Sequence, residues 1–384
     1  MPVEVDAKPD VLRWARERVS LSPSELASRL GWKKADRIII WEQSGRIQLK
    51  HLERLAEKTY TPIGYLFLDT PPEERLPIPD FRTVAGHPPE RPSPNLLDTV
   101  YQAQLRQSWF REHLLQYDEE PLPFVGRATL NSNPESVGAE IRDAIAFDTT
   151  QRAQMATWEE ALRTMFDNAE SAGVLIMRNG IVGNNTHRKL DVTEFRGFTI
   201  SDEFAPLIFV NAADTKAAQM FTLAHELAHV WLNVSGVSNW RLQTSEKVER
   251  FCNAVAAEVL VPMAEFKTKW DPAKEPIEEA RRLARRYKTS SLVLIIRAYE
   301  AAFLSRSEFD ELYDAEKARF TDRVSGGGGD FYLTQRSRIG RRFARAVIAG
   351  ALEGSVPFKE AFQLLGLKRS ETFMELAKSL GVAS

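Results

Sequence analysis

Apolar residues recur at helical spacing through the first seventy positions of the chain, separated by polar and turn-forming residues. Ser22 and Pro23 mark one helix start, because a capping serine and a proline at the first helical position both favour initiation. An all-α domain is therefore predicted over residues 1–70. Its five short helices are expected near residues 11–15, 23–30, 33–43, 49–56 and 62–68.

Patterns typical of strands occur only in the middle of the chain, among longer helical patterns. A small sheet surrounded by helices predicts an α+β core over residues 96–305, and residues 306–384 are predicted to be mainly helical, with no assigned role. Proline-rich residues 71–95 are expected to form an extended linker. The expected strands are 173–177, 198–200 and 207–210, and the expected helices 96–117, 135–146, 157–172 and 280–305.

The composition limits the number of domains, the kinds of partner and the location of the protein. A length of 384 residues suggests two or three domains, and a formal net charge of −2 gives no overall preference for nucleic acid or membrane surfaces. The single cysteine, Cys252, excludes an internal disulfide and favours a cytoplasmic location. The first ten residues lack the apolar run of a signal peptide, and no apolar stretch approaches the roughly 20 residues of a membrane span.

The candidate chemistry lies in the apolar helical stretch from Phe221 to Trp231. His225 and His229 are four positions apart, so one face of a helix directs both imidazoles towards a single metal ion. Glu226 projects from the neighbouring turn, where its carboxylate could take a proton from a metal-bound water. This His-Glu-x-x-His pattern favours a metalloenzyme over a chance occurrence on the surface.

A catalytic zinc needs a third protein ligand, and the next helical stretch offers two carboxylates. Glu249 shares a face with Asn253, whereas Glu258 lies nine positions further on, near the opposite side. Glu249 is therefore the predicted ligand, and Asn253 is predicted to orient a ligand. Two alternatives stay open: Glu258 as the ligand, or Glu249 paired with a basic neighbour on a solvated face. Cys252, on the same helix, is interpreted as a small core residue.

Residues 206–262 resemble the ImmA/IrrE family of zinc metallopeptidases. The matching features are a strand ending in Asn211, the block Phe-Thr-Leu-Ala-His-Glu-Leu-Ala-His, and a helix with Glu-x-x-x-Asn-x-x-Ala-Ala-Glu-x-Leu-x-Pro. The resemblance implies a zincin-like core, with Zn²⁺ held by His225, His229 and Glu249 and Glu226 as catalytic base. It also implies a protein substrate, namely a helix-turn-helix repressor or antitoxin whose inactivation switches on stress or mobile-element genes.

Two further expectations concern how a substrate is held. The strand at residues 207–211 could be a sheet edge that pairs with an extended peptide. His187 could donate to the oxyanion, although a loop histidine is more often simply exposed to solvent. The run Asp80-Phe81-Arg82-Thr83 is typical of family members that carry a helix-turn-helix domain, and it suggests that the linker is partly docked.

The N-terminal helices, with Trp41-Glu42-x-Ser44-Gly45 closing the third, resemble an XRE/Cro-type helix-turn-helix domain. In that family the third helix enters the major groove of DNA, and here it offers Lys33, Lys34 and Arg37. Residues 1–70 contain 12 basic and 10 acidic residues, a small surplus for a DNA-binding domain. The domain is therefore expected to bind either DNA or another helix-turn-helix protein.

Three functional hypotheses follow. The leading one is a zinc-dependent endopeptidase that cleaves a helix-turn-helix repressor. The alternatives are a DNA-binding transcriptional regulator with a structural or vestigial metal site, and an adaptor that binds a repressor without cutting it. Arg338, Arg341 and Arg345 fall at helical spacing, which predicts either a solvated face or a basic patch for an acidic partner.

Overall fold

The computed structural model describes residues 3–82, 91–238, 246–321 and 337–383, and the chain divides into two compact units. The N-terminal unit consists of Met1–Pro77 with Glu90–Asp98, and the second unit of Ile78–Pro89 with Thr99–Ser384. The predicted α+β class is confirmed. Residues 71–95, which were predicted to be a separate linker, are thus divided between the two units. No helix in these ranges is both long and apolar enough to cross a membrane.

The N-terminal unit contains all five predicted helices around one apolar core. Ser22 and Glu25 form a complete capping box, in which each side chain accepts from the other residue's backbone N–H. A short antiparallel pair of strands was not predicted, because three-residue strands carry too little alternation to be recognised. The elements are β1 (Glu4–Asp6), α1 (Pro9–Glu17), α2 (Pro23–Arg29), α3 (Asp36–Ser44), β2 (Arg46–Gln48), α4 (Leu49–Thr59) and η1 (Ile63–Phe67).

The second unit is built on a four-stranded sheet of order β3-β7-β6-β8. β3 (Leu175–Asn179) runs parallel to β7 (Leu207–Asn211), while β6 (Gly197–Ile200) is antiparallel to both β7 and β8 (Gly236–Ser238). The prediction that the strand at 207–211 is a sheet edge is therefore wrong, because β7 pairs on both sides. The two strands that flank β7 were both predicted, so the error lies in the pairing order, which the pattern of each strand alone does not give.

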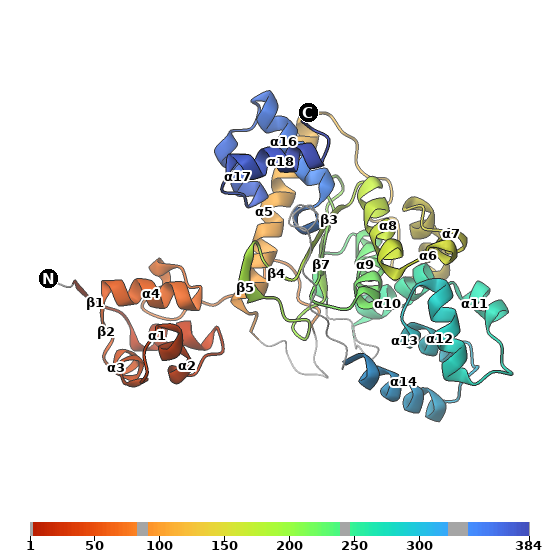
Figure 1. The fold of residues 1–384 in the computed structure, drawn as a ribbon, viewed down its shortest axis with the longest axis horizontal. Helices are drawn as coiled ribbons and strands as arrows, with labels where there is room; N and C mark the ends of the chain where they lie inside the picture. Colours follow the sequence, from red (N-terminus) through yellow and green to blue (C-terminus); the bar gives the residue numbers. More distant parts are fainter. Residues whose placement is uncertain (1–2, 83–90, 239–245, 322–336, 384) are drawn as a thin grey trace. The chain divides into compact units, whose positions relative to one another are not determined.

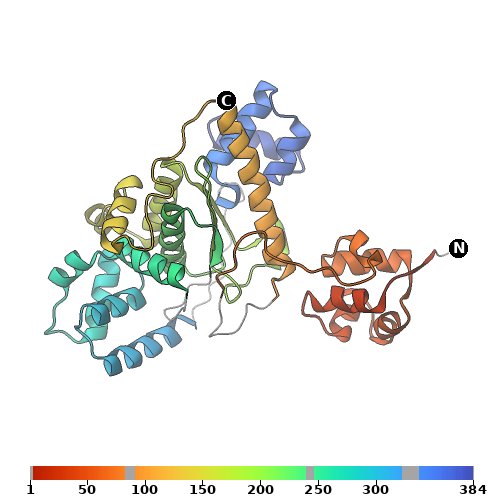
Figure 2. The ribbon, with the colours of Figure 1, turned by 180° about the vertical axis from the view of Figure 1, so that it is seen from behind.

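Helices cover both faces of this sheet (Figures 1 and 2). α8 (Trp158–Ser171) and α9 (Lys216–Leu232) pack on one face, and α5 (Pro94–Gln116) lies on the other side. Successive residues of β6 alternate between the faces: Thr199 contacts α9, whereas Phe198 stacks on Phe209 away from it. α10 (Lys247–Leu260) packs along α9 and so faces the same interior.

The remaining elements surround this centre. The helix expected over residues 280–305 is two helices, because Lys288 adopts a left-handed conformation (φ 47°) that ends the first of them. The others are α6 (Pro134–Ala144), α7 (Thr149–Gln154), the hairpin β4 (Ile181–Val182) and β5 (Asn185–Lys189), α11 (Met263–Lys269), α12 (Pro276–Tyr287), α13 (Ser291–Glu300), α14 (Arg306–Thr321), α16 (Arg341–Glu353), α17 (Phe358–Leu365) and α18 (Ser370–Ser379).

The C-terminal arginines serve internal contacts. Arg338 donates to Asn184 Oδ1 at 2.9 Å, Arg341 lies 3.4 Å from an Asp167 carboxylate oxygen, and Arg345 donates to the Leu380 carbonyl at 3.2 Å. Arg341 and Arg345 tie α16 to α8 and to the end of α18, and Arg338, which precedes α16, contacts the β4–β5 hairpin. The structure therefore favours a packing role for this arginine row over a patch for an acidic partner.

The C-terminal end of α10 is held by three arginines. Arg142 donates to the Glu258 carbonyl, Arg152 donates to the Leu260 carbonyl, and Arg297 Nε donates to the Val261 carbonyl at 3.0 Å. These are carbonyls that the end of a helix leaves without internal partners. Arg297 Nη2 also lies 2.6 Å from Glu258 Oε1 in a pair that is almost fully buried. The C-terminal end of α10 is thereby tied to α6, α7 and α13.

Replacement of Arg297 by Met is expected to lower the free energy of unfolding of the second unit by about 3–5 kcal/mol, since Glu258 would be left buried without its partner. Chemical denaturation followed by circular dichroism measures this change. The matched control is Arg306→Met, which breaks a pair with Asp310 whose side chains are 58% and 51% exposed. The control should cost less than about 1 kcal/mol, and similar losses in both variants would contradict the anchoring role.

Candidate metal centre

α9 places the His-Glu-x-x-His residues in the centre of the second unit. Fourteen of its 17 residues are buried, so the helix is enclosed on nearly every side and not only along one stripe. Thr215 caps its N-terminus by accepting from the Ala218 N–H, and Asn233 ends it in a left-handed conformation. His225, Glu226 and His229 consequently lie in the interior, with no side chain exposed to solvent.

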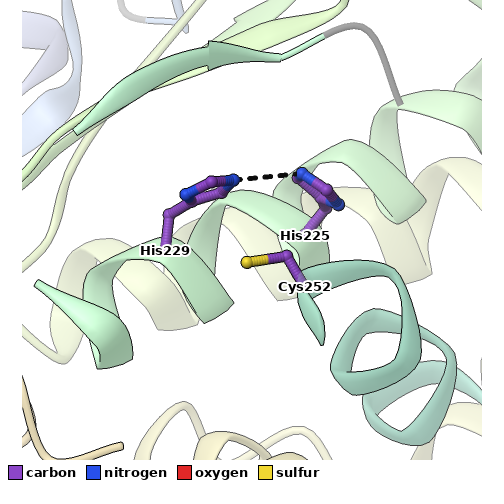
Figure 3. Close-up of side chains that lie close together, drawn as sticks. All are labelled: His225, His229 and Cys252. Atoms are coloured by element: carbon purple, nitrogen blue, oxygen red, sulfur yellow. Dashed lines mark hydrogen bonds between the residues drawn. The ribbon is translucent and has the colours of Figure 1, made fainter. Parts of the chain in front are cut away.

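Three side chains from α9 and α10 converge on one point. The Nε2 atoms of His225 and His229 are 3.2 Å apart (Figure 3), and Glu249 Oε1 lies 3.1 Å from His229 Nε2. Glu249 Oε2 lies 3.4 Å from His225 Nε2. Ligand atoms around a tetrahedral ion with bonds of about 2.0–2.1 Å are separated by roughly 3.3 Å. The spacing of the three side chains therefore fits a single metal ion.

Asn253 sets the tautomer of one imidazole. Its Oδ1 lies 3.0 Å from His225 Nδ1, and an amide oxygen can only accept a hydrogen bond. His225 Nδ1 therefore carries the proton, which leaves the Nε2 lone pair directed at the point of convergence. The Nδ1 of His229 has no hydrogen-bond partner among the described residues.

The two candidate carboxylates of α10 have separate environments. Burial by itself raises the pKa of Glu249, but the charge and hydrogen bonds of the two imidazoles outweigh it and hold the pKa well below its usual range. Glu249 is thus ready to act as an anionic ligand. Glu258 instead pairs with Arg297 and accepts from the Met263 N–H at the far end of the helix. Of the two, the structure brings only Glu249 to the imidazoles.

Cys252 lies beside the cluster formed by His225, His229 and Glu249 (Figure 3). Its Sγ and the nearest nitrogens of His225 and His229 all lie within 4.8 Å of one another, so this buried group could hold a metal ion. Burial, reinforced by the charges of Glu249 and Glu226, raises the pKa of the Cys252 thiol well above its usual value. Cys252 is also part of the apolar core of the second unit, as the sequence suggested.

Glu226 is buried between α9 and β6. Its Oε2 accepts from the Thr199 hydroxyl at 2.7 Å, and its Oε1 has no partner among the described residues. Burial raises the pKa of Glu226 to about 7, against the opposing effects of His229 and Thr199. Gly197 makes room for this carboxylate, because a Cβ there would lie 2.9 Å from Oε1 and 2.6 Å from the Thr222 methyl group.

Three residues that contact the cluster or Glu226 were not predicted. They are Thr199, Ser238 and Phe81: the Ser238 hydroxyl lies 3.4 Å from both His229 Nε2 and Glu249 Oε1, and the Phe81 ring stacks on the His229 ring. Thr199 lies in a predicted strand, and the alternation of side chains between the two faces of that strand could have predicted that it faces α9. Nothing in the local sequence indicates Ser238, and the Asp80-Phe81-Arg82-Thr83 run suggests a docked linker without placing Phe81 at His229.

The other predicted site residues lie elsewhere. His187 is exposed on β5, in a hairpin separate from the four-stranded sheet, and is not among the described side chains in contact with the cluster. Its role as an oxyanion donor stays a prediction. Lys33, Lys34 and Arg37 are exposed in the N-terminal unit. The third helix was predicted to begin at Lys33, but α3 begins at Asp36, so Lys33 and Lys34 lie in the turn before it. Arg37 lies in the first turn of α3, with its guanidinium over the Trp32 ring.

Two parts of the chain match known family models. Residues 169–299 match the Peptidase_M78 model, described as the IrrE N-terminal-like domain, and residues 339–379 match a domain of unknown function, DUF8813. Neither match reaches the N-terminal unit. No curated protein matches the chain. The first match runs from the end of α8 to α13 and includes the whole cluster, so the part of the chain that carries this centre is similar to the peptidase domain of the ImmA/IrrE family.

Proposed function

We propose that the second unit is a zinc-dependent endopeptidase in which His225, His229 and Glu249 hold the metal and Glu226 transfers the proton. The observation that carries the proposal is the mutual separation of 3.1–3.4 Å between the three ligand atoms. The match of residues 169–299 to a peptidase family supports it. Two imidazoles and one carboxylate are also a donor set that zinc accepts while keeping one position open.

Glu226 is placed to move the proton in peptide hydrolysis. Zinc bound by the three ligands would supply Lewis acidity, which polarises the scissile carbonyl. Thr199 holds Glu226 Oε2, which leaves Oε1 to accept a proton from the attacking water. As the C–N bond breaks, Glu226 returns that proton to the leaving amine, so the carboxylate is regenerated.

The proposed substrate is a helix-turn-helix repressor or antitoxin, whose cleavage would relieve repression in a stress or mobile-element response. The resemblance to the ImmA/IrrE family supports this substrate class. The N-terminal unit offers a second argument, since Ile39 and Ile40 on α3 are 43% and 55% exposed. An apolar pair at this position suits contact with another protein.

Metal analysis separates Glu249 from its neighbour Cys252. The purified protein should contain about one zinc per chain. Glu249→Ala should lose most of it, because one of three ligands is removed, while Cys252→Ala should retain it. Elemental analysis by mass spectrometry on identically prepared samples measures both. Loss of zinc in Cys252→Ala with full retention in Glu249→Ala would assign the third ligand to the thiol instead.

Glu226→Gln is expected to keep the zinc and lower cleavage of a cognate repressor by at least about 10²-fold, because the amide cannot accept the proton. Mass spectrometry of the repressor fragments gives the rate and the bond cut. Thr199→Val, which removes the hydrogen bonds to Oε2 and to the Glu226 backbone carbonyl, should reduce the rate less. Cleavage by Glu226→Gln at the rate of the unaltered protein would refute the proposed role.

A DNA-binding regulator is a second candidate, favoured by the surroundings of His51 in the N-terminal unit. The pKa of His51 is lowered first by burial and then by Lys50, Arg37 and Arg54, so these cations gather around one imidazole. Such a basic group suits contact with phosphates.

If this candidate is correct, operator DNA should bind with steep salt dependence, and charge reversal of Lys33, Lys34 and Arg37 should abolish binding. Electrophoretic mobility shift assays over a salt series test it. The control is Lys58→Glu, because Lys58 already pairs with Glu57. Failure to bind at the lowest salt would eliminate this candidate. Complex formation with a repressor that a chelator leaves unchanged would instead support the adaptor.

A further inference from the structure

Residues Ile78–Arg82, here called the strap, extend the sheet beside the cluster. Asp80 forms a parallel bridge with Val237 of β8. The Val237 N–H donates to the Pro79 carbonyl at 2.9 Å, and the Phe81 N–H donates to the Val237 carbonyl at 3.1 Å. Since β8 is the last strand of the sheet on this side, the strap occupies the edge that lies beside the cluster.

Phe81 takes a position beside the candidate metal ligands. Its ring stacks on the His229 ring, with centroids 5.7 Å apart and an angle of 17° between the planes. Gly236 provides the space, because a Cβ on that residue would lie 2.2 Å from the Phe81 ring. Gly236 and His229 therefore form a seat that fits a flat aromatic side chain.

An ion-pair network centred on the buried Arg82 side chain fixes the strap next to this seat. Arg82 Nε and Nη2 donate to the two carboxylate oxygens of Asp80 at 2.8 and 2.6 Å, which is a bidentate arrangement. Arg82 Nη1 donates to Glu194 Oε1 at 3.2 Å, and the Arg82 side chain is only 6% exposed. Docking of the linker, suggested by its Asp-Phe-Arg-Thr run, is thus observed for residues 78–82.

We propose that the strap is a built-in occupant of the edge on which an extended peptide substrate pairs, so that the substrate must displace it. This inference rests on the peptidase function proposed above. A sheet edge accepts one added strand at a time, and the strap already uses both hydrogen-bonding groups of Val237. The substrate class that follows is an extended peptide with an aromatic side chain for the seat formed by Gly236 and His229.

The route of the chain gives the strap a means of release. The segment assigned to the second unit at this point, Ile78–Pro89, continues into the N-terminal unit at both of its ends. A partner that binds the N-terminal unit better when the strap is undocked would shift the population towards the open edge. Binding in one unit would then control access to the centre in the other.

The test uses a fluorescently labelled peptide with the sequence of residues 77–82, Pro-Ile-Pro-Asp-Phe-Arg, and the full-length protein. Fluorescence anisotropy should show at least about tenfold tighter binding to Phe81→Ala than to the unaltered protein, because the variant loses the half-buried ring that stacks on His229 and holds its own strap. The control Phe67→Ala removes a phenylalanine that is 50% exposed in the N-terminal unit, and should bind like the unaltered protein. Equal binding by all three proteins would overturn the proposal.

Hydrogen exchange provides a second measurement that requires neither zinc nor catalysis. Peptides covering the strap should exchange faster in Phe81→Ala and in Gly236→Ala, whose new methyl group would overlap the Phe81 ring. Gly236→Ala should also fail to bind the labelled peptide, because the seat is filled. Unchanged exchange in both variants, or tight peptide binding by Gly236→Ala, would count against the seat.

Cleavage of a repressor distinguishes failure of this inference from failure of the peptidase proposal. Faster cleavage by Phe81→Ala, reversed by added peptide, is the expected result. Equal cleavage by the unaltered protein and Phe81→Ala would reject inhibition by the strap while leaving the peptidase intact. Peptide binding to Phe81→Ala without cleavage by either protein would reject the peptidase and retain the peptide-binding edge.

Discussion

Burial of ionisable groups at the α9–α10 contact is the constraint on which the rest of the second unit depends. Two imidazoles and the carboxylates of Glu226 and Glu249 lie almost completely out of water, which costs several kcal/mol for each charge that lacks a partner. Thr199 and Asn253 supply two of the required partners. The three arginines bonded to the end of α10 stabilise the helix that carries Glu249 and Asn253. The candidate chemistry therefore depends on how this helix is capped.

The three residues of β8 connect the cluster with the surface. Ser238 places a hydroxyl near His229 and Glu249, Gly236 leaves room for an aromatic ring, and Val237 offers its backbone groups at the sheet edge. A substitution in this short strand would therefore affect the cluster, the seat and the edge together. The same strand explains why the proline-rich segment docks where it does, since it offers hydrogen bonds at an edge where no other strand of the described residues pairs.

Sequence reasoning was most reliable where one helix sets the geometry. The four-residue spacing of His225 and His229, and the shared face of Glu249 and Asn253, follow from helical periodicity, and the structure has both arrangements. Contacts between distant segments could not be predicted in this way. Ser238 reaches the cluster only because β8 pairs with β6, about forty residues earlier in the chain. The error in placing the sheet edge has the same origin, because edges depend on which strands pair.

The most direct test of the central claim, that two imidazoles and the Glu249 carboxylate form a zinc site, is X-ray absorption spectroscopy of the zinc-loaded protein. If the claim is correct, the metal has only nitrogen and oxygen neighbours at about 2.0–2.2 Å, with the outer-shell scattering of two imidazoles. A sulfur neighbour at about 2.3 Å would contradict it, because that sulfur would come from Cys252 and the carboxylate would no longer be needed as the third ligand.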